Sequence, residues 1–436
     1  MKSALIWMKH NPIAVVAALL SVCSLVGLFV VYLQGSSFVE EMEKRNSAVQ
    51  RIKTLKTTRV KIPSPDLDNP VEHRDITINE AAIESLKEVY HKMGIEYTNI
   101  FALAVNQNRK GHDPLLDGLF PSFERRVDKV YDAQVQYLNA FEAMLLEYSP
   151  TDIYPRLDAG GSVDLAQVTA EVNLAQKNFM LRLGLPDDAV NLLTAEQQQQ
   201  LVSERRGAAI RVMTQHAERH HIYVDDPTMP GTVFQIGEWS NSAFKPDISV
   251  IWQGQLELWV QQDIVQAISS ANQVWSPTAN VLSNPVKKLL NMSVTPGYVG
   301  IDTTGALTTA GRLTPGEKRR DSVRLPNGFR MTPTGRRSNN IYDVVHARVS
   351  LIVDYRQISK VFEAFGKTNF MTVLKADLTD VDEYEALHNG FMYGDSDCVQ
   401  LDMIIESLWL RDWTKRLMPQ AIKERLSIET KDASGR

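Results

Sequence analysis

The chain has 436 residues, of which 44% are hydrophobic and 23% are charged, and its formal net charge is -5. This length and composition can supply two or three domains of about 100–200 residues each. The modest charge excludes a strongly basic nucleic-acid-binding or polyanion-binding protein. The only two cysteines, Cys23 and Cys398, lie far apart in the sequence, which excludes a disulfide-stabilised scaffold.

Residues 12–33 form an apolar stretch of the length that a helix needs to cross about 30 Å of hydrocarbon. Lysines precede this stretch and glutamates follow it, so the positive-inside rule predicts a cytoplasmic tail, residues 1–11, and a bulk that lies outside the cytoplasm. The alternative is a cleaved signal peptide, whose apolar region is about 7–15 residues long. The greater length here favours a single-pass membrane anchor.

Two segments connect this stretch to the rest of the chain. Residues 34–58 are highly charged, with apolar residues recurring at spacings of three, four and seven. This spacing predicts a helical stalk or short coiled coil, and a solvated helix without a partner is the alternative. Residues 59–78 contain three prolines, which predict a stiff linker.

A helical region is predicted over residues 79–225. Asn79 can cap a first helix that ends at Gly94 and carries an apolar stripe of Ile83, Leu86, Val89, Tyr90 and Met93. A second apolar stripe runs from Phe123 to Leu145, and a third begins at Leu165 and ends at Gly184. A fourth helix is predicted from Thr194 to His220. These helices are expected to pack as a small bundle or a hairpin layer.

Residues 245–410 change from a helical period to a period of two, which is typical of half-buried strands. Each of two successive units contains a strand, a helix and a further strand, and the second unit continues into a last strand. The predicted strands cover residues 248–260, 286–294, 345–355, 371–378 and 399–405. The helix of the second unit is predicted to end at Gly366. Two such β-α-β units predict an α+β fold with a ferredoxin-like α/β sandwich.

Residues 302–340, between the two units, are rich in Gly, Thr, Pro and Arg and have almost no apolar periodicity. We expect a disordered basic insertion. Its arginines, with Arg319 and Arg320 at the centre, could bind an acidic partner surface, and a solvated insertion is the alternative. Residues 411–436 form a C-terminal segment.

His216 and His220 are the best metal candidates, because a spacing of four places both imidazoles on one helix face. Zinc proteases need a glutamate directly after the first histidine, and Ala217 stands there. Gly366-Lys367-Thr368 matches the end of a phosphate-binding loop, but the loop also needs a glycine where Val361 stands. Without a catalytic constellation, the sequence predicts a protein that is not an enzyme and has no metal or cofactor.

Tryptophans are concentrated in residues 245–413. Exposed aromatic rings on an open sheet would mark an interface, whereas buried rings would belong to the core. Trp409 and Trp413 run off the end of the last predicted strand. They are therefore the candidate partner-binding aromatics.

The order of a short tail, a single span, a helical stalk, helices and a ferredoxin-like domain resembles the bitopic inner-membrane proteins of type IV pilus and type II secretion machines, of the PilN/PilO and GspL/GspM type. The resemblance rests on residues 12–33, the stalk 36–58 and the units 248–294 and 344–405. It implies a non-catalytic scaffold in the cell inner membrane with a periplasmic bulk. It also implies pairing as a homodimer or heterodimer with other subunits, and no contact with nucleic acid. The alternative is an extracytoplasmic metal-dependent hydrolase or binding domain that uses His216 and His220.

Overall fold

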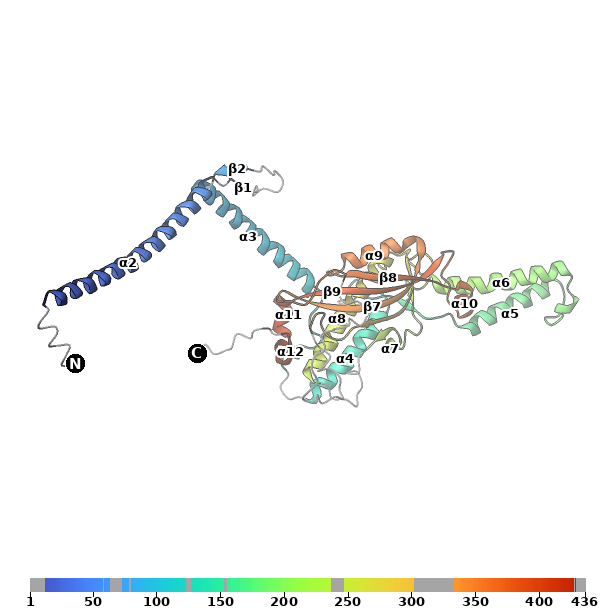
Figure 1. The fold of residues 1–436 in the computed structure, drawn as a ribbon. Helices are drawn as coiled ribbons and strands as arrows, with labels where there is room; N and C mark the ends of the chain where they lie inside the picture. Colours follow the sequence, from blue (N-terminus) through green and yellow to red (C-terminus); the bar gives the residue numbers. More distant parts are fainter. Residues whose placement is uncertain are drawn as a thin grey trace. The chain divides into compact units, whose positions relative to one another are not determined.

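A computed structural model describes residues 12–57, 59–62, 73–77, 80–122, 127–152, 155–236, 247–301, 333–426 and 428 (Figure 1). Over these residues the chain is mixed α/β. It divides into two compact units, Met1–Ala102 and Leu103–Arg436.

The first unit begins with one long helix, α2 (Pro12–Thr57). Its segment Val15–Tyr32 is long and apolar enough to cross a membrane, a property that membrane spans and signal sequences share. The helix then continues through the predicted stalk, so the helical part of that prediction is confirmed. Pairs such as Lys44–Glu40, one turn apart on the exposed surface, each add a few tenths of a kcal/mol to helix stability.

The predicted linker contains two short antiparallel strands, β1 (Arg59–Ile62) and β2 (His73–Thr77). The three prolines between them lie outside the described residues. Helix α3 (Glu80–Arg109) follows and passes straight through Gly94, so the predicted end at Gly94 is wrong. An interior glycine costs a helix only about 1 kcal/mol. The helix ends instead just before Gly111, whose positive φ of 81° a glycine adopts readily.

Three further helices lie close to their predicted positions: α4 (Val127–Leu145), α5 (Leu165–Arg182) and α6 (Ala195–Ala217). Helices α5 and α6 lie side by side as a hairpin (Figure 1), with the buried side chains of Phe179, Met180, Leu193 and Leu201 between them. A capping box of Thr194 and Gln197 starts α6. Of the two predicted arrangements, α5 and α6 form the hairpin, whereas α4 packs on a different helix, α8. The short elements η1 (Val190–Leu192), β3 (Ala159–Gly160), β4 (Ile222–Tyr223), α7 (Pro230–Val233) and β5 (Phe234–Gln235) complete this region.

Residues 248–260, predicted as a strand, belong to helix α8 (Ile248–Asn272), so that prediction is wrong. The helix is buried on nearly all sides, and polar side chains such as Gln255 and Glu257 are buried together with the apolar ones. The alternation of apolar and polar residues therefore does not separate an inner face from an outer face. Asp247 caps the start of α8, and Gln273 ends it in the left-handed conformation.

The four other predicted strands are confirmed as β6 (Val286–Val294), β7 (Tyr342–Asp354), β8 (Thr372–Asp380) and β9 (Cys398–Leu410). The sheet order is β3-β4-β6-β7-β9-β8, and the pairs β6–β7, β7–β9 and β9–β8 are antiparallel. Helix α9 (Ile358–Lys367) connects β7 to β8 and runs through Gly366, which was predicted to end it. One β-α-β unit therefore remains of the two predicted. The remaining elements are η3 (Tyr355–Gln357), α10 (Glu383–His388), α11 (Arg411–Leu417) and α12 (Gln420–Arg425).

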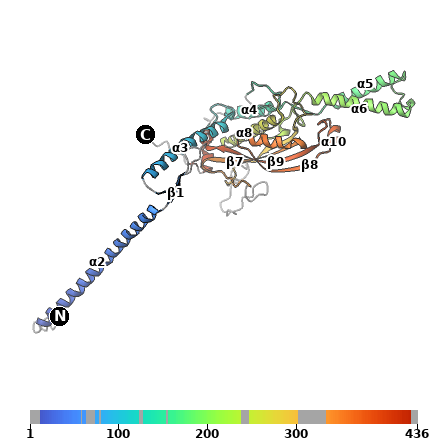
Figure 2. The same cartoon turned by 90° about the horizontal axis from the view of Figure 1, so that it is seen from above.

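One core joins the sheet to the helices. Alternate residues of β7 and β9, such as Val349, Leu351 and Met403, are buried in the same cluster as Trp252 and Leu256 of α8. Helices α8 and α9 contact each other, α8 also contacts β6, and α9 also contacts β8; Figure 2 shows α8 beside strands β7, β9 and β8. The opposite face of the sheet is more polar. The candidate surfaces therefore lie on the sheet edge, the polar face and the outward sides of the helices.

Candidate interaction surfaces

Trp409 and Trp413 are 1% and 6% exposed, so they do not form an open aromatic surface. Both rings pack against Trp259, with ring centroids 5.7 Å and 5.2 Å apart. The interpretation of these two tryptophans as exposed partner-binding aromatics is therefore corrected: they belong to the core. Arg319 and Arg320 lie outside the described residues, and their role in binding a partner stays a prediction.

His216 and His220 lie next to each other, with ring centroids 5.1 Å apart. The Nε2 of His216 is 2.9 Å from the carbonyl oxygen of Gly161. Burial, followed by the neighbouring His216, lowers the pKa of His220. The His220 ring fills the space where a Cβ on Gly160 would stand. In the described part of the chain, no group of three or more His, Cys, Asp or Glu side chains could hold a metal ion.

A buried polar network centres on Asn108, near the end of α3. Its Nδ2 donates to Asn369 Oδ1 and to the carbonyl of Leu408, both at 2.9 Å. Its Oδ1 accepts from the backbone N–H of Leu410 and from Trp413 Nε1, both at 2.8 Å. All four hydrogen-bonding positions of the amide are therefore used. The network fixes the end of α3 to β9 and α11.

His112 extends this network. Its Nε2 is 2.9 Å from Asp263 Oδ1, and Asn369 donates to the other carboxylate oxygen at 2.6 Å. Burial works to lower the pKa of His112, but the charge and hydrogen bond of Asp263 outweigh it, and the pKa is raised above 6.5. Each oxygen of Asp263 thus has one hydrogen-bond partner, and the two contacts hold the carboxylate in place.

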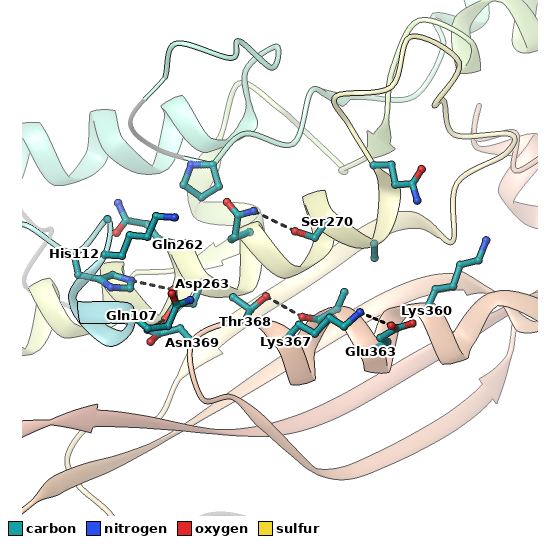
Figure 3. Close-up of a pocket in the computed structure, with 17 residues that line it drawn as sticks. Gln107, His112, Gln262, Asp263, Ser270, Lys360, Glu363, Lys367, Thr368 and Asn369 are labelled. Atoms are coloured by element: carbon teal, nitrogen blue, oxygen red, sulfur yellow. Dashed lines mark hydrogen bonds and ion pairs between the residues drawn. The ribbon is translucent and has the colours of Figure 1, made fainter. Parts of the chain in front are cut away.

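A cleft of about 710 Å³ opens beside this network, between α8 and α9 (Figure 3). Its floor contains the buried Gln262, and Lys360 and Lys367 stand on its α9 side. Lys367 is paired with Glu363 at the surface. On the α8 side, Gln266 donates to the Ser270 hydroxyl at 3.1 Å, so the described lining is mostly polar.

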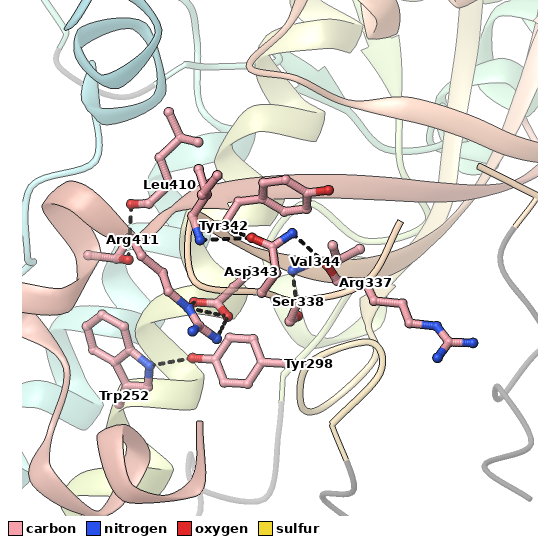
Figure 4. Close-up of polar contacts among 12 residues, drawn as sticks. Trp252, Tyr298, Arg337, Ser338, Tyr342, Asp343, Val344, Leu410 and Arg411 are labelled. Carbon is pink, nitrogen blue, oxygen red and sulfur yellow. Dashed lines mark hydrogen bonds and ion pairs between the residues drawn. The ribbon is translucent and has the colours of Figure 1, made fainter. Parts of the chain in front are cut away.

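A second polar cluster holds the two ends of the segment between β6 and β7 (Figure 4). Arg411 donates to both oxygens of the buried Asp343, with its closest contact at 2.6 Å. Burial raises the pKa of Asp343 despite this partner. Beside this pair, Trp252 Nε1 donates to the Tyr298 hydroxyl at 2.8 Å. The backbone N–H of Ser338 donates to the carbonyl of Val299, which joins the two ends of the basic insertion.

Helix α3 carries a long apolar stripe. Its members alternate at spacings of three and four, the pattern of a coiled-coil seam. They are Ile83, Leu86, Tyr90, Met93, Tyr97 and Ile100. Leu86 is half-buried, and the other five are 47% to 66% exposed. The sequence interpretation identified this stripe only as far as Met93, because it ended the helix at Gly94. The unbroken spacing of the apolar residues across Gly94 was the signal that could have revealed the remainder.

Strand β8 is the last strand in the sheet order, at the edge of the sheet (Figure 2). Among the strands that the structure describes, it pairs only with β9. Every residue from Lys375 to Asp380 is exposed. Lys375 Nζ lies against the Asp377 carboxylate on one face of the strand. The sequence had predicted this strand but gave no indication that it forms the edge.

Comparison with known proteins adds little. No protein-family model matches the chain, and no curated protein matches it. A crystal structure from Akkermansia muciniphila aligns with 65% of this chain and 94% of its own, at 9% sequence identity and a TM-score of 0.24.

Proposed function

We propose that this protein is a non-catalytic, membrane-anchored scaffold of an envelope-spanning assembly, and that α3 pairs with a helix of a neighbouring subunit. The observation that carries the proposal is the exposed apolar stripe from Ile83 to Ile100. Six apolar side chains in coiled-coil spacing are a costly surface to leave in water, and a partner helix would cover them.

The size of the stripe supports a stable pairing. If each of its six side chains loses roughly 100 Å² of accessible surface, a helix buries roughly 600 Å² along the seam. A standard protein interface buries about 800 Å² per partner. Residues beside the seam, such as Phe101 and Leu103, and the apolar residues of the stalk can supply the remainder.

Two further features support the wider proposal. The segment Val15–Tyr32 supplies a helix that can anchor the chain in the inner membrane with its N-terminus in the cytoplasm. In the second unit, the main elements follow one another along the chain as α8-β6-β7-α9-β8-β9, and four of the strands lie in the sheet in the order β6-β7-β9-β8. This supports a ferredoxin-like arrangement in which the chain begins with a helix instead of a strand. We infer that this unit is a ferredoxin-like domain in which helix α8 stands where the first strand, residues 248–260, was predicted.

Site-specific photocrosslinking in cells tests the pairing. A photoreactive phenylalanine analogue replaces Tyr90 or Tyr97 in the full chain, and the matched control replaces Glu88, which is exposed on the opposite side of α3. We expect adducts from the two seam positions and none from position 88. Adducts of equal yield from all three positions, or from none of them, would show that the stripe is not an interface.

The anchor is tested separately. Full-length protein should stay in the membrane pellet after carbonate extraction. A reporter fused to the C-terminus should be active only outside the cytoplasm. Release of a shortened chain into the soluble extracytoplasmic fraction would identify residues 12–33 as a signal peptide.

A further inference from the structure

The exposed edge of β8 is self-complementary. If two copies of the strand run antiparallel with Ala376 opposite itself, Lys375 of one copy stands opposite Asp377 of the other, and this happens twice by symmetry. In the same register, Leu374 stands opposite Leu378 of the second copy. An unpaired strand edge offers a ladder of backbone N–H and C=O groups for such a contact.

We propose that a second copy of this chain pairs with β8 in this register and joins the two sheets into one. The inference goes beyond the proposed function, which assigns a partner to α3 and leaves the sheet edge unassigned. The occupant follows from charge complementarity, because each Lys375 ammonium would lie between the Asp377 carboxylates of its own copy and of the other.

The charges also distinguish this register from the two symmetric registers next to it. A symmetric antiparallel pair must place one residue opposite itself. If that residue were Lys375, two ammonium groups would face each other, and if it were Asp377, two carboxylates would do so. Either arrangement is destabilising. Ala376 is the only residue between them, and its small side chain allows the two strands to approach at the axis.

Apolar contacts reinforce the pair. Leu374 lines a shallow groove between α9 and β8, together with Phe362 of α9 and Met371. Leu378 is 52% exposed in a single copy. In the proposed register, Leu378 of the second copy lies beside Leu374 at the mouth of this groove. Both leucines thereby lose contact with water.

Cysteine crosslinking of the full chain in membranes tests the register. Cys23 and Cys398 are first replaced by Ser and Ala, and single cysteines are then placed at 374, 376 or 378. Opposed Cα atoms of an antiparallel pair are about 4.5–5.5 Å apart, within disulfide range, whereas two copies of residue 374 would be about 13 Å apart. We expect Ala376→Cys to form dimers alone, and Leu374→Cys to form them only when mixed with Leu378→Cys.

Charge exchange supplies the second measurement. In the Ala376→Cys chain, Lys375→Asp should lower the dimer yield about tenfold, because two attractive pairs become two repulsive ones. Asp377→Lys should do the same, and the double exchange should restore the yield. Restoration also shows that the variants fold. Equal dimer yields from Leu374→Cys alone and Ala376→Cys alone, or yields that ignore the charges, would overturn the proposal.

Discussion

Replacing Asn108 by Ala should be among the most destabilising single changes in the second unit. The side chain is fully buried and makes four hydrogen bonds. Truncation leaves two buried donors without a partner, the Leu410 N–H and the Trp413 indole N–H. Each orphaned donor costs about 1–3 kcal/mol, so we expect a loss of about 4 kcal/mol in the free energy of unfolding.

This loss can be measured on the full chain in detergent. For a unit of this size, about 4 kcal/mol corresponds to a fall of roughly 10 °C in melting temperature. Tryptophan fluorescence is a suitable signal, because the Trp413 ring itself contacts Asn108. The matched control is Asn106→Ala, an exposed change on the same helix, which should alter stability by less than about 0.5 kcal/mol. If the two variants melt at the same temperature, the network does not fix α3 as described.

Three further predictions follow from single contacts. Because the pKa of His112 is raised above 6.5, its pairing with Asp263 should stabilise the fold fully below that pH and progressively less as the pH rises through the folded-state pKa. When melting temperature is measured as a function of pH, this loss of stability should appear in the wild-type protein and be absent from His112→Gln. A wild-type melting temperature that instead rises across this pH range would contradict the assignment. Val349→Asp should cost several kcal/mol in a denaturant titration, because Val349 is only 1% exposed in the core; a cost under about 1 kcal/mol would contradict its inward position. A double His216→Ala, His220→Ala variant should leave assembly in cells unchanged, as measured by co-purification, and loss of assembly by a folded variant would favour the metal-dependent alternative.

The sequence was informative where one face of an element meets water and the other does not. In the middle of strand β7, exposed Arg348 and half-buried Ser350 alternate with buried Val349 and Leu351, and this period was identified correctly. The same use of periodicity gave a wrong prediction for helix α8, because its polar residues are buried by partners from distant segments. Gln255, for example, accepts hydrogen bonds from Leu115 N–H and from the Tyr137 hydroxyl. Apolar residues recur with a regular period when one face of an element is buried and the other is exposed to solvent. A helix that is buried on all sides does not show this period.

The candidate surfaces show the same limit. The rings of Trp409 and Trp413 are buried against Trp259, and Trp413 also donates to Asn108, about 300 positions earlier; no local pattern encodes these distant contacts. The stripe of α3, in contrast, was present in the sequence in full. It was identified only as far as Met93, because Gly94 was given more weight than the regularly spaced apolar residues on both sides of it.

The hydrogen bonds of Asn108 also set an order of events during synthesis. Its partners Leu408 and Trp413 are separated from it by 300 and 305 residues. The end of α3 therefore cannot reach its final surroundings until nearly the whole chain has left the ribosome. Until then, Asn108 lacks three of its four hydrogen-bond partners, and the ring of Trp259 lacks its contacts with Trp409 and Trp413. A chain truncated before residue 408 would lack these contacts permanently.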